Sequence, residues 1–139
     1  MTNIENLCKI LSENNDVGKN TAATEMQTSL ACIKLRKAKI PPLPDEFCRL
    51  LQNFNGLSHE GNTVFGVDTK TDFFPDAAEV NLSILEGQKT DCVILGQDEY
   101  CFLVYDYFAK KYRVIDKEDF SDELCTDDIS DAVCHILGI

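Results

Sequence analysis

The sequence is poor in the residues from which catalytic and metal sites are usually built. Its 139 residues include two histidines, two methionines and no tryptophan. His59 is expected in a polar turn, and His135 follows Cys134 in a helical pattern, where adjacent side chains point about 100° apart and do not form a nucleophile–base pair. No two of the seven cysteines have C-x-x-C spacing, and there is no G-x-S-x-G or Walker-type motif. We therefore expect no enzyme activity, no cofactor and no metal site.

Basic residues are also scarce. Lysine and arginine number 13 against 24 acidic residues, which gives a formal net charge of −11. Nucleic-acid binding relies on lysine and arginine to displace counterions from phosphates, so this balance argues against a nucleic-acid partner and equally against an anionic membrane. It favours attraction to a basic protein. Nothing in the sequence indicates an oligomeric state.

The sequence has no long apolar run and no recognisable targeting segment. No window approaches the roughly 20 apolar residues of a membrane span. The first residues have neither the basic start nor the apolar stretch of a signal peptide. An odd number of cysteines without a secretory signal argues against a disulfide framework. We expect a cytoplasmic protein whose thiols are reduced and buried.

Apolar residues recur at helical spacing in five stretches, a pattern typical of amphipathic helices. The spacing predicts helices over about residues 3–14, 21–36, 44–54, 76–86 and 126–136. In the second helix the buried stripe is expected to pass through Met26, Leu30 and Ile33. In the last helix, Thr126 is expected to be the N-cap, with Asp127 and Asp128 in the first turn, where acids oppose the helix dipole.

Between residues 91 and 116 the pattern changes from helix to strand. Residues 92–95 and 100–105 are short apolar runs bounded by turn formers, which predicts buried strands. In the third run, Tyr112 and Val114 fall on one face and Lys111 and Arg113 on the other, as in a strand with one wet side. A further strand is expected over residues 63–67. Helices, then an antiparallel meander, then a closing helix predict one α+β domain over residues 1–139, with the terminal helices packed on the sheet.

Short motifs after residue 40 follow one another as in the SUKH superfamily. They are Leu43-Pro44 opening a helix that ends in Asn55-Gly56, Phe65-Gly66, a helix with Asn81, Ile94-Leu95-Gly96 with Asp98 behind it, and strands ending in Asp106 and Asp116. The resemblance covers about residues 40–139, so residues 1–39 are interpreted as a variable N-terminal helical part. The family often has a glycine pair where this chain has Gly96-Gln97. That departure leaves the subfamily open.

The resemblance implies a curved, mainly antiparallel sheet with helices packed against it and no catalytic residues. It also implies that Pro44, Gly56 and Gly66 lie in turns and Phe65 lies in the core. The aspartates at the strand ends are expected to cap turns or touch a partner. The superfamily includes bacterial immunity proteins, many of which neutralise a toxin that is often a nuclease, and fungal cell-wall-synthesis regulators. The leading hypothesis is an immunity protein, and the alternative is a regulatory or scaffold protein in cell-wall synthesis.

Acidic residues are concentrated between residues 116 and 131. Eight fall within sixteen residues that contain one lysine. Helix capping and solvation account for part of this density, and the ligand order of a calcium loop is absent. The functional interpretation is a docking surface that attracts a basic toxin domain electrostatically. The candidate partner-binding residues are these eight and two in the preceding turn: Asp98, Glu99, Asp116, Glu118, Asp119, Asp122, Glu123, Asp127, Asp128 and Asp131.

Overall fold

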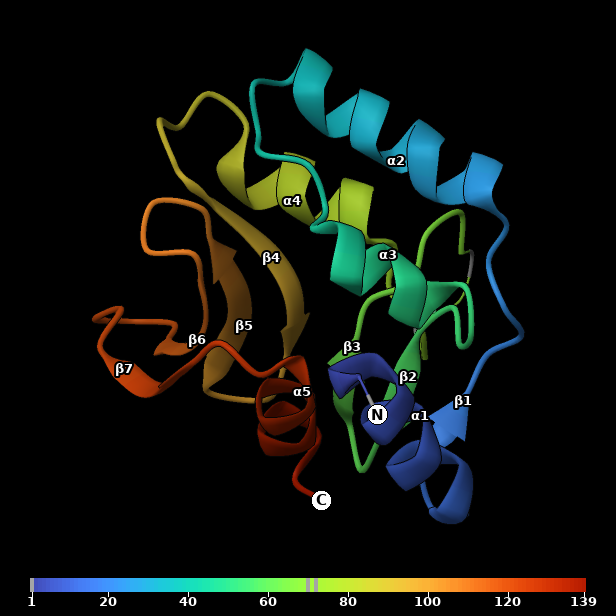
Figure 1. Ribbon diagram of the computed structural model, residues 1–139. Coiled ribbons are helices and arrows are strands. Elements are labelled where there is room, and N and C mark those ends of the chain that lie inside the picture. The colour runs from blue at the N-terminus through green and yellow to red at the C-terminus, as the bar shows by residue number, and fades with distance from the viewer. Residues whose placement is uncertain (1, 70, 72) are drawn as a thin grey trace.

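The computed structural model describes residues 2–69, 71 and 73–139 and contains an open antiparallel sheet with helices packed against it (Figure 1). The strands are β1 (Gly18–Lys19), β2 (Leu57–His59), β3 (Asn62–Val64), β4 (Cys92–Gln97), β5 (Cys101–Asp106), β6 (Lys111–Asp116) and β7 (Asp122–Thr126). The helices are α1 (Asn3–Glu13), α2 (Glu25–Lys37), α3 (Asp45–Leu51), α4 (Ala77–Leu85) and α5 (Ile129–Leu137). The strands lie in the sheet in their order along the chain. The predicted α+β fold is confirmed.

The predicted meander is β4, β5 and β6, which form the middle of the sheet. β5 pairs along its whole length with β6, and the expected alternation in β6 is confirmed, since Tyr112 and Val114 are buried while Lys111 and Arg113 are partly exposed. The pairing of β4 with β5 shifts by one residue near Gly96. A side chain at Gly96 would place its Cβ 2.6 Å from the carbonyl oxygen of Thr63 on β3. Glycine therefore allows β3 and β4 to come together at this bulge.

The N-terminal helices begin at reciprocal caps. Thr2 and Glu5 form a capping box at the start of α1, and Thr24 and Gln27 form one at the start of α2. Because Thr24 is the N-cap, α2 begins at Glu25, later than the predicted start near residue 21. Its buried stripe is also different from the prediction, because Thr28, Ala31 and Leu35 face inward. Met26, Leu30 and Ile33 are instead 72%, 51% and 44% exposed.

The last helix also starts later than predicted. Asp128, not Thr126, is the N-cap of α5, and its carboxylate accepts a hydrogen bond from the backbone N–H of Ser130 at 2.8 Å. Thr126 ends β7, and its hydroxyl accepts a hydrogen bond from the N–H of Asp128 at 3.0 Å. The segment between β6 and α5 therefore contains a strand and a turn. Neither the strand nor the turn was predicted, because the segment is rich in polar residues and has no apolar alternation.

One apolar core joins the helices to the sheet. α5 packs on β5, β6 and β7 and contacts α1, while α2 packs on α4. Leu7 from α1, Leu35 from α2 and Phe47 from α3 are fully buried in the same cluster as Phe65 and Leu103. Residues 1–39 therefore share one hydrophobic core with residues 40–139. None of the helices in the described residues is long and apolar enough to cross a membrane.

Two buried asparagines complete the backbone hydrogen bonding where the sheet ends. The side chain of Asn81 on α4 accepts from the N–H of Ile94 at 2.7 Å and donates to its carbonyl at 2.8 Å. Asn55 binds both backbone groups of Val67 in the same way, at 2.8 and 2.9 Å. A primary amide can satisfy a donor and an acceptor together, so Asn81 pairs with β4 as a neighbouring strand would, and Asn55 fixes the segment that follows β3.

Candidate protein-binding site

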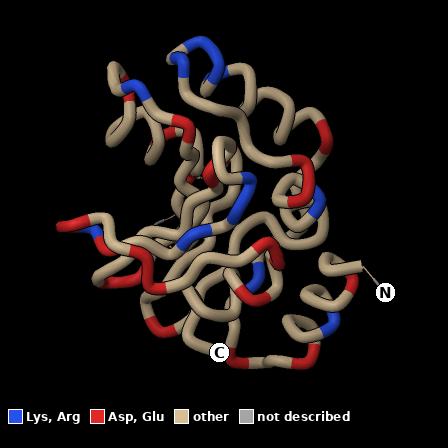
Figure 2. The backbone as a smooth tube through the Cα atoms, turned by 60° about the vertical axis from the view of Figure 1, so that its left-hand side comes forward, with Lys and Arg blue, Asp and Glu red and all other residues tan. Residues whose placement is uncertain are grey.

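The ten predicted partner-binding acids do not form one continuous surface. Five of them lie at one end of the sheet: Asp98 and Glu99 are in the β4–β5 turn, Asp116 ends β6, and Glu118 and Asp119 are in the β6–β7 turn. Asp127 and Asp128 lie at the opposite end of β7, a strand of five residues that spans roughly 13 Å. Figure 2 shows acidic residues on the loop that projects furthest on its left side, whereas lysine and arginine gather at the top, at the C-terminal end of α2.

The two turns at the first end are held together by backbone and carboxylate hydrogen bonds. The carboxylate of Asp98 accepts from the N–H groups of Tyr100 and Cys101, at 2.9 and 2.7 Å. Asp116 accepts in the same way from Glu118 and Asp119, at 2.8 and 3.2 Å. The N–H of Lys117 donates to the carbonyl of Tyr100 at 2.9 Å, which joins one turn to the other. Asp98 and Asp116 therefore shape the turns.

The same end carries two exposed aromatic side chains. Tyr100 is 70% exposed and Phe120 is 61% exposed. Phe120 has a φ of 58°, a left-handed conformation that is unfavourable for a bulky residue. It also lines an apolar hollow of about 370 Å³ with Phe102 and Ile115. We call the surface formed by Asp98, Glu99, Tyr100, Glu118, Asp119 and Phe120 the acidic tip.

Glu99 and Glu118 are the acids of the tip that are free to meet a partner. Both are exposed, and neither accepts a hydrogen bond or forms an ion pair with any residue that the structure describes. Asp119 is also exposed, and its carboxylate accepts from the N–H and hydroxyl of Ser121, at 2.9 and 2.7 Å. These bonds to the Ser121 hydroxyl and backbone lower the pKa of Asp119, so it stays ionised.

Asp122 on β7 is engaged in an ion-pair chain across the sheet. Arg113 on β6 donates to Asp122 from Nε at 2.7 Å and to the buried Asp106 from a terminal nitrogen at 3.0 Å. Asp106 also accepts from the N–H groups of Phe108 and Ala109, at 2.9 and 3.1 Å. Hydrogen bonds from Arg113 to Asp122 and Asp106 raise the pKa of the guanidinium. Asp122 therefore stabilises the strand pair, and a partner would have to compete with Arg113 for it.

Glu123 connects β7 with β5 and α5. Its carboxylate accepts from the thiol of Cys101 at 2.9 Å and lies 3.4 Å from Nε2 of His135. The hydrogen bond from Cys101, followed by the charge of His135, lowers the pKa of Glu123. Burial and the same carboxylate raise the pKa of Cys101 to about 12, so this thiol remains protonated. Asp131, the next acid on α5, is exposed and accepts no hydrogen bond from the described residues.

The acids at the far end of β7 border a different surface. Asp128 caps α5, while Asp127 is exposed and lies 3.4 Å from Nζ of Lys111 in a surface ion pair. Asp127 also lines a groove of about 480 Å³ between the α2–α3 segment and the β5–β6 hairpin. We call this hollow the tyrosine groove.

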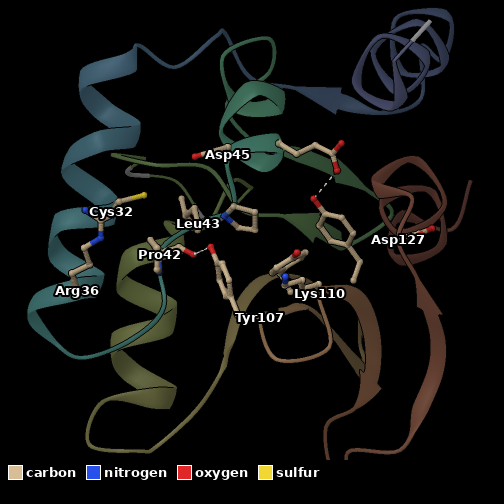
Figure 3. Close-up of a pocket in the computed structure, with 12 residues that line it drawn as sticks. Cys32, Arg36, Pro42, Leu43, Asp45, Tyr107, Lys110 and Asp127 are labelled. Carbon is tan, nitrogen blue, oxygen red and sulfur yellow. Dashed lines mark hydrogen bonds between the residues drawn. The ribbon is translucent and has the colours of Figure 1, made fainter.

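Three tyrosines form one wall of the tyrosine groove (Figure 3). The ring of Tyr105 lies 4.8 Å from Tyr107 and 4.9 Å from Tyr112, centroid to centroid, and both pairs are edge to face. The hydroxyl of Tyr107 donates to the carbonyl of Pro42 at 2.6 Å, and that of Tyr112 donates to Glu46 at 2.9 Å. Burial raises the pKa of Tyr107 to about 12, and burial with the charge of Glu46 raises that of Tyr112 further. Both hydroxyls therefore act as fixed hydrogen-bond donors.

Charges of both signs surround the tyrosine groove. Arg36 and Lys110 lie on its rim with Asp45 and Asp127, and Cys32 contributes a sulfur from α2. With charges of both signs and hydrogen-bonded tyrosine hydroxyls, the groove suits a polar ligand that carries both positive and negative groups. They give the groove less attraction for a strongly basic partner than the acidic tip has.

His59 has a structural position that its surroundings in the sequence did not predict. It lies in β2, and its Nδ1 is 2.7 Å from the carbonyl of Leu137 at the C-terminal end of α5. The imidazole thus satisfies one of the free carbonyls that end a helix. In the part of the chain that the structure describes, no three His, Cys, Asp or Glu side chains are arranged to hold a metal ion.

The exposed aromatics and the tyrosine groove were missed by sequence reasoning. Tyr100 and Phe120 each follow an acidic pair, Asp98-Glu99 and Glu118-Asp119, and this repeated order was the available signal for the tip. The groove had no such signal, because its walls come from segments about sixty residues apart in the sequence. No protein-family model matches the sequence, and a search of curated proteins found no match.

Proposed function

We propose that this chain is a non-enzymatic, cytoplasmic binding protein that captures a basic protein through the acidic tip. The observation that supports the proposal best is the position of the exposed Tyr100 and Phe120 beside Glu99 and Glu118, whose carboxylates form no hydrogen bond or ion pair with the described residues. Aromatic side chains commonly supply most of the binding energy of an interface, and surrounding charge sets the encounter rate and the choice of partner.

We further propose that the captured protein is a toxin domain and that the role is immunity. This step depends on the SUKH-like order of motifs and on the net charge of −11, which suits a nuclease whose own surface is basic. Covering the toxin's nucleic-acid groove would be sufficient for neutralisation. A toxin gene beside the gene for this chain favours immunity, and its absence favours the regulatory role in cell-wall synthesis.

Co-purification with the product of the gene immediately upstream tests the proposal. Phe120→Asn removes the aromatic ring, while asparagine tolerates the left-handed backbone. We expect this change to weaken binding by roughly 30-fold, the effect of a hot-spot residue worth about 2 kcal/mol. Phe108→Asn is the matched control, since Phe108 is 87% exposed in the β5–β6 turn away from the tip. Equal binding by both variants would show that the tip is not the binding surface.

A further inference from the structure

The sheet ends at β7, and the outer edge of this strand is open (Figure 1). β7 pairs with β6, and no other strand of the described residues pairs with it. The remaining hydrogen bonds of β7 within the described residues are made by the side chains of Asp122, Glu123 and Thr126. α5 contacts β5 and β6 as well as β7, so it lies across a face of the sheet. The backbone along the outer edge is therefore free to bind another strand.

The hydrogen-bonding pattern identifies a backbone group that points outward. The N–H of Asp116 donates to the carbonyl of Ser121 at 3.0 Å, so Asp116 directs its backbone towards β7. In an antiparallel pair, every second residue of a strand bonds to the same neighbour. Val114 therefore also bonds to β7, and its partner there is Leu124. Cys125, the next residue, directs its N–H and its carbonyl away from β6.

The charges along the open edge are mostly negative. Residues 119–128 contain five acids and no lysine or arginine. Basic side chains of β6 form ion pairs with two of these acids, so the excess stays negative. In an antiparallel pair with a second copy, Asp122 and Glu123 of one chain would approach Asp127 of the other, and like charges oppose such pairing. Many edge strands carry lysine or proline, which discourage pairing, and β7 has neither.

We infer that the captured basic protein adds an extended segment to the outer edge of β7 as an eighth strand, an inference that rests on the proposed function. The main chain of this segment bonds to the N–H and carbonyl of Cys125, and its lysine or arginine side chains lie beside Asp122 and Glu123. In strand addition, main-chain hydrogen bonds supply affinity and the side chains supply specificity. Phe120 lies two positions before β7, so one partner reaches both the edge and the acidic tip.

Hydrogen exchange with a model peptide tests the position of the added strand. The full-length reduced chain is titrated with a synthetic peptide of alternating lysine and valine, and amide exchange is followed by NMR. Exchange of the Cys125 N–H should slow by roughly tenfold when the peptide is bound. The N–H of Leu124, which already bonds to β6, should change little. A peptide of alternating glutamate and valine controls for the sign of the charge and should not bind.

Methylation of the peptide backbone separates strand addition from attraction by charge alone. A lysine–valine peptide with every backbone nitrogen methylated keeps its charge but has no N–H to donate. It should bind by roughly tenfold less than the unmethylated peptide, because the main-chain hydrogen bonds are lost. This comparison leaves the protein unchanged, so it does not depend on whether a variant folds.

Cys125→Pro tests the same edge from the side of the protein. Proline is tolerated in an edge strand where the N–H that it removes faces solvent, so the pairing of β7 with β6 is kept. We expect this variant to bind the lysine–valine peptide roughly tenfold more weakly. Cys125→Ser is the matched control, because it changes the side chain and retains the N–H. Circular dichroism checks that both variants are folded.

Three results would overturn the inference: no binding of the unmethylated lysine–valine peptide, equal binding of its methylated form, or unchanged exchange at Cys125. Protection of Cys125 that grows with the concentration of the chain alone would also overturn it, because a second copy would then occupy the edge. None of these results decides the role of the acidic tip. That role is tested by Phe120→Asn and the co-purified protein, so the two proposals fail separately.

Discussion

Asn81 shows how a single polar residue can close the edge of a sheet. It is fully buried on α4, and its amide binds both backbone groups of Ile94, which pairs with β5 on one side and lies beyond the pairing with β3 on the other. The resemblance pointed to Asn81 without indicating a role for it. Its position and its two bonds give that role: it attaches α4 to the sheet.

Replacement of Asn81 by alanine should be strongly destabilising. The change leaves a buried N–H and a buried carbonyl without partners, which costs about 2–4 kcal/mol of unfolding free energy. Urea unfolding followed by circular dichroism measures this loss. Asn53→Ala is the control, because Asn53 is exposed just after α3 and, among the described residues, its side chain bonds only to the carbonyl of Arg49. A loss no larger than that of the control would mean that Asn81 is not a structural anchor.

The aspartates that end the strands illustrate what could be predicted at the residue scale. Asp98, Asp106 and Asp116 were expected to cap turns or to meet a partner, and each accepts hydrogen bonds from two backbone N–H groups in the next turn. Aspartate favours this geometry because its short side chain reaches the backbone two and three residues ahead. The capping expectation is confirmed, while a contact with a partner stays a prediction.

At the scale of elements, strong apolar periodicity predicted what short or polar segments did not. α1, α4 and the meander follow long patterns and were predicted closely. β1 and β2 have only two and three residues, too few for alternation to be recognised. β7 was missed because Asp122 and Glu123 made the segment look like a solvated loop. In α2 the small residues Thr28 and Ala31 face inward, where α2 packs on α4, so the larger side chains are left outside.

The N-cap of α5 can be tested with two adjacent aspartates. Asp128→Ala removes the acceptor of the Ser130 N–H and should lower stability by about 1 kcal/mol. Asp127→Ala removes the same charge one residue earlier but only an exposed ion pair with Lys111, typically worth less than about 0.5 kcal/mol. Thermal or urea unfolding of the two variants separates the roles. Equal losses would contradict the assignment of Asp128 as the cap.

The attachment of β7 should weaken in acid. The pKa of Glu123 is lower in the folded chain than its ordinary value of 4.5, so its ionised form stabilises the folded state. This contribution is complete above pH 4.5 and disappears as the pH falls through the lowered value. Glu123→Gln should therefore be less stable than the natural chain at pH 7, and the two should converge on acidification. A difference that stays constant down to low pH would show that the carboxylate charge is not responsible.

At the scale of the whole molecule, the sequence predicted the fold class but not the shape of the binding surface. Core packing does not explain the density of acids, as predicted. Three of them, Asp122, Glu123 and Asp128, nevertheless form hydrogen bonds or ion pairs that stabilise strands and helices. Reversing their charges would disturb folding and binding at once. Glu99 and Glu118 are the better probes, because they make no such bonds within the described residues. The sequence could not separate the acids that stabilise the fold from those that are free to bind a partner, because the two kinds differ only in the residues they contact in the structure.

The measurement that tests the central claim most directly is the association rate of the captured partner as a function of ionic strength. Glu99→Lys with Glu118→Lys should slow association by roughly tenfold at low salt and reduce its salt dependence. Glu13→Lys with Glu86→Lys changes the net charge equally on exposed residues of α1 and at the end of α4, and should have a much smaller effect. If the two double variants associate at the same rate at every salt concentration, the acidic tip is not where the partner docks.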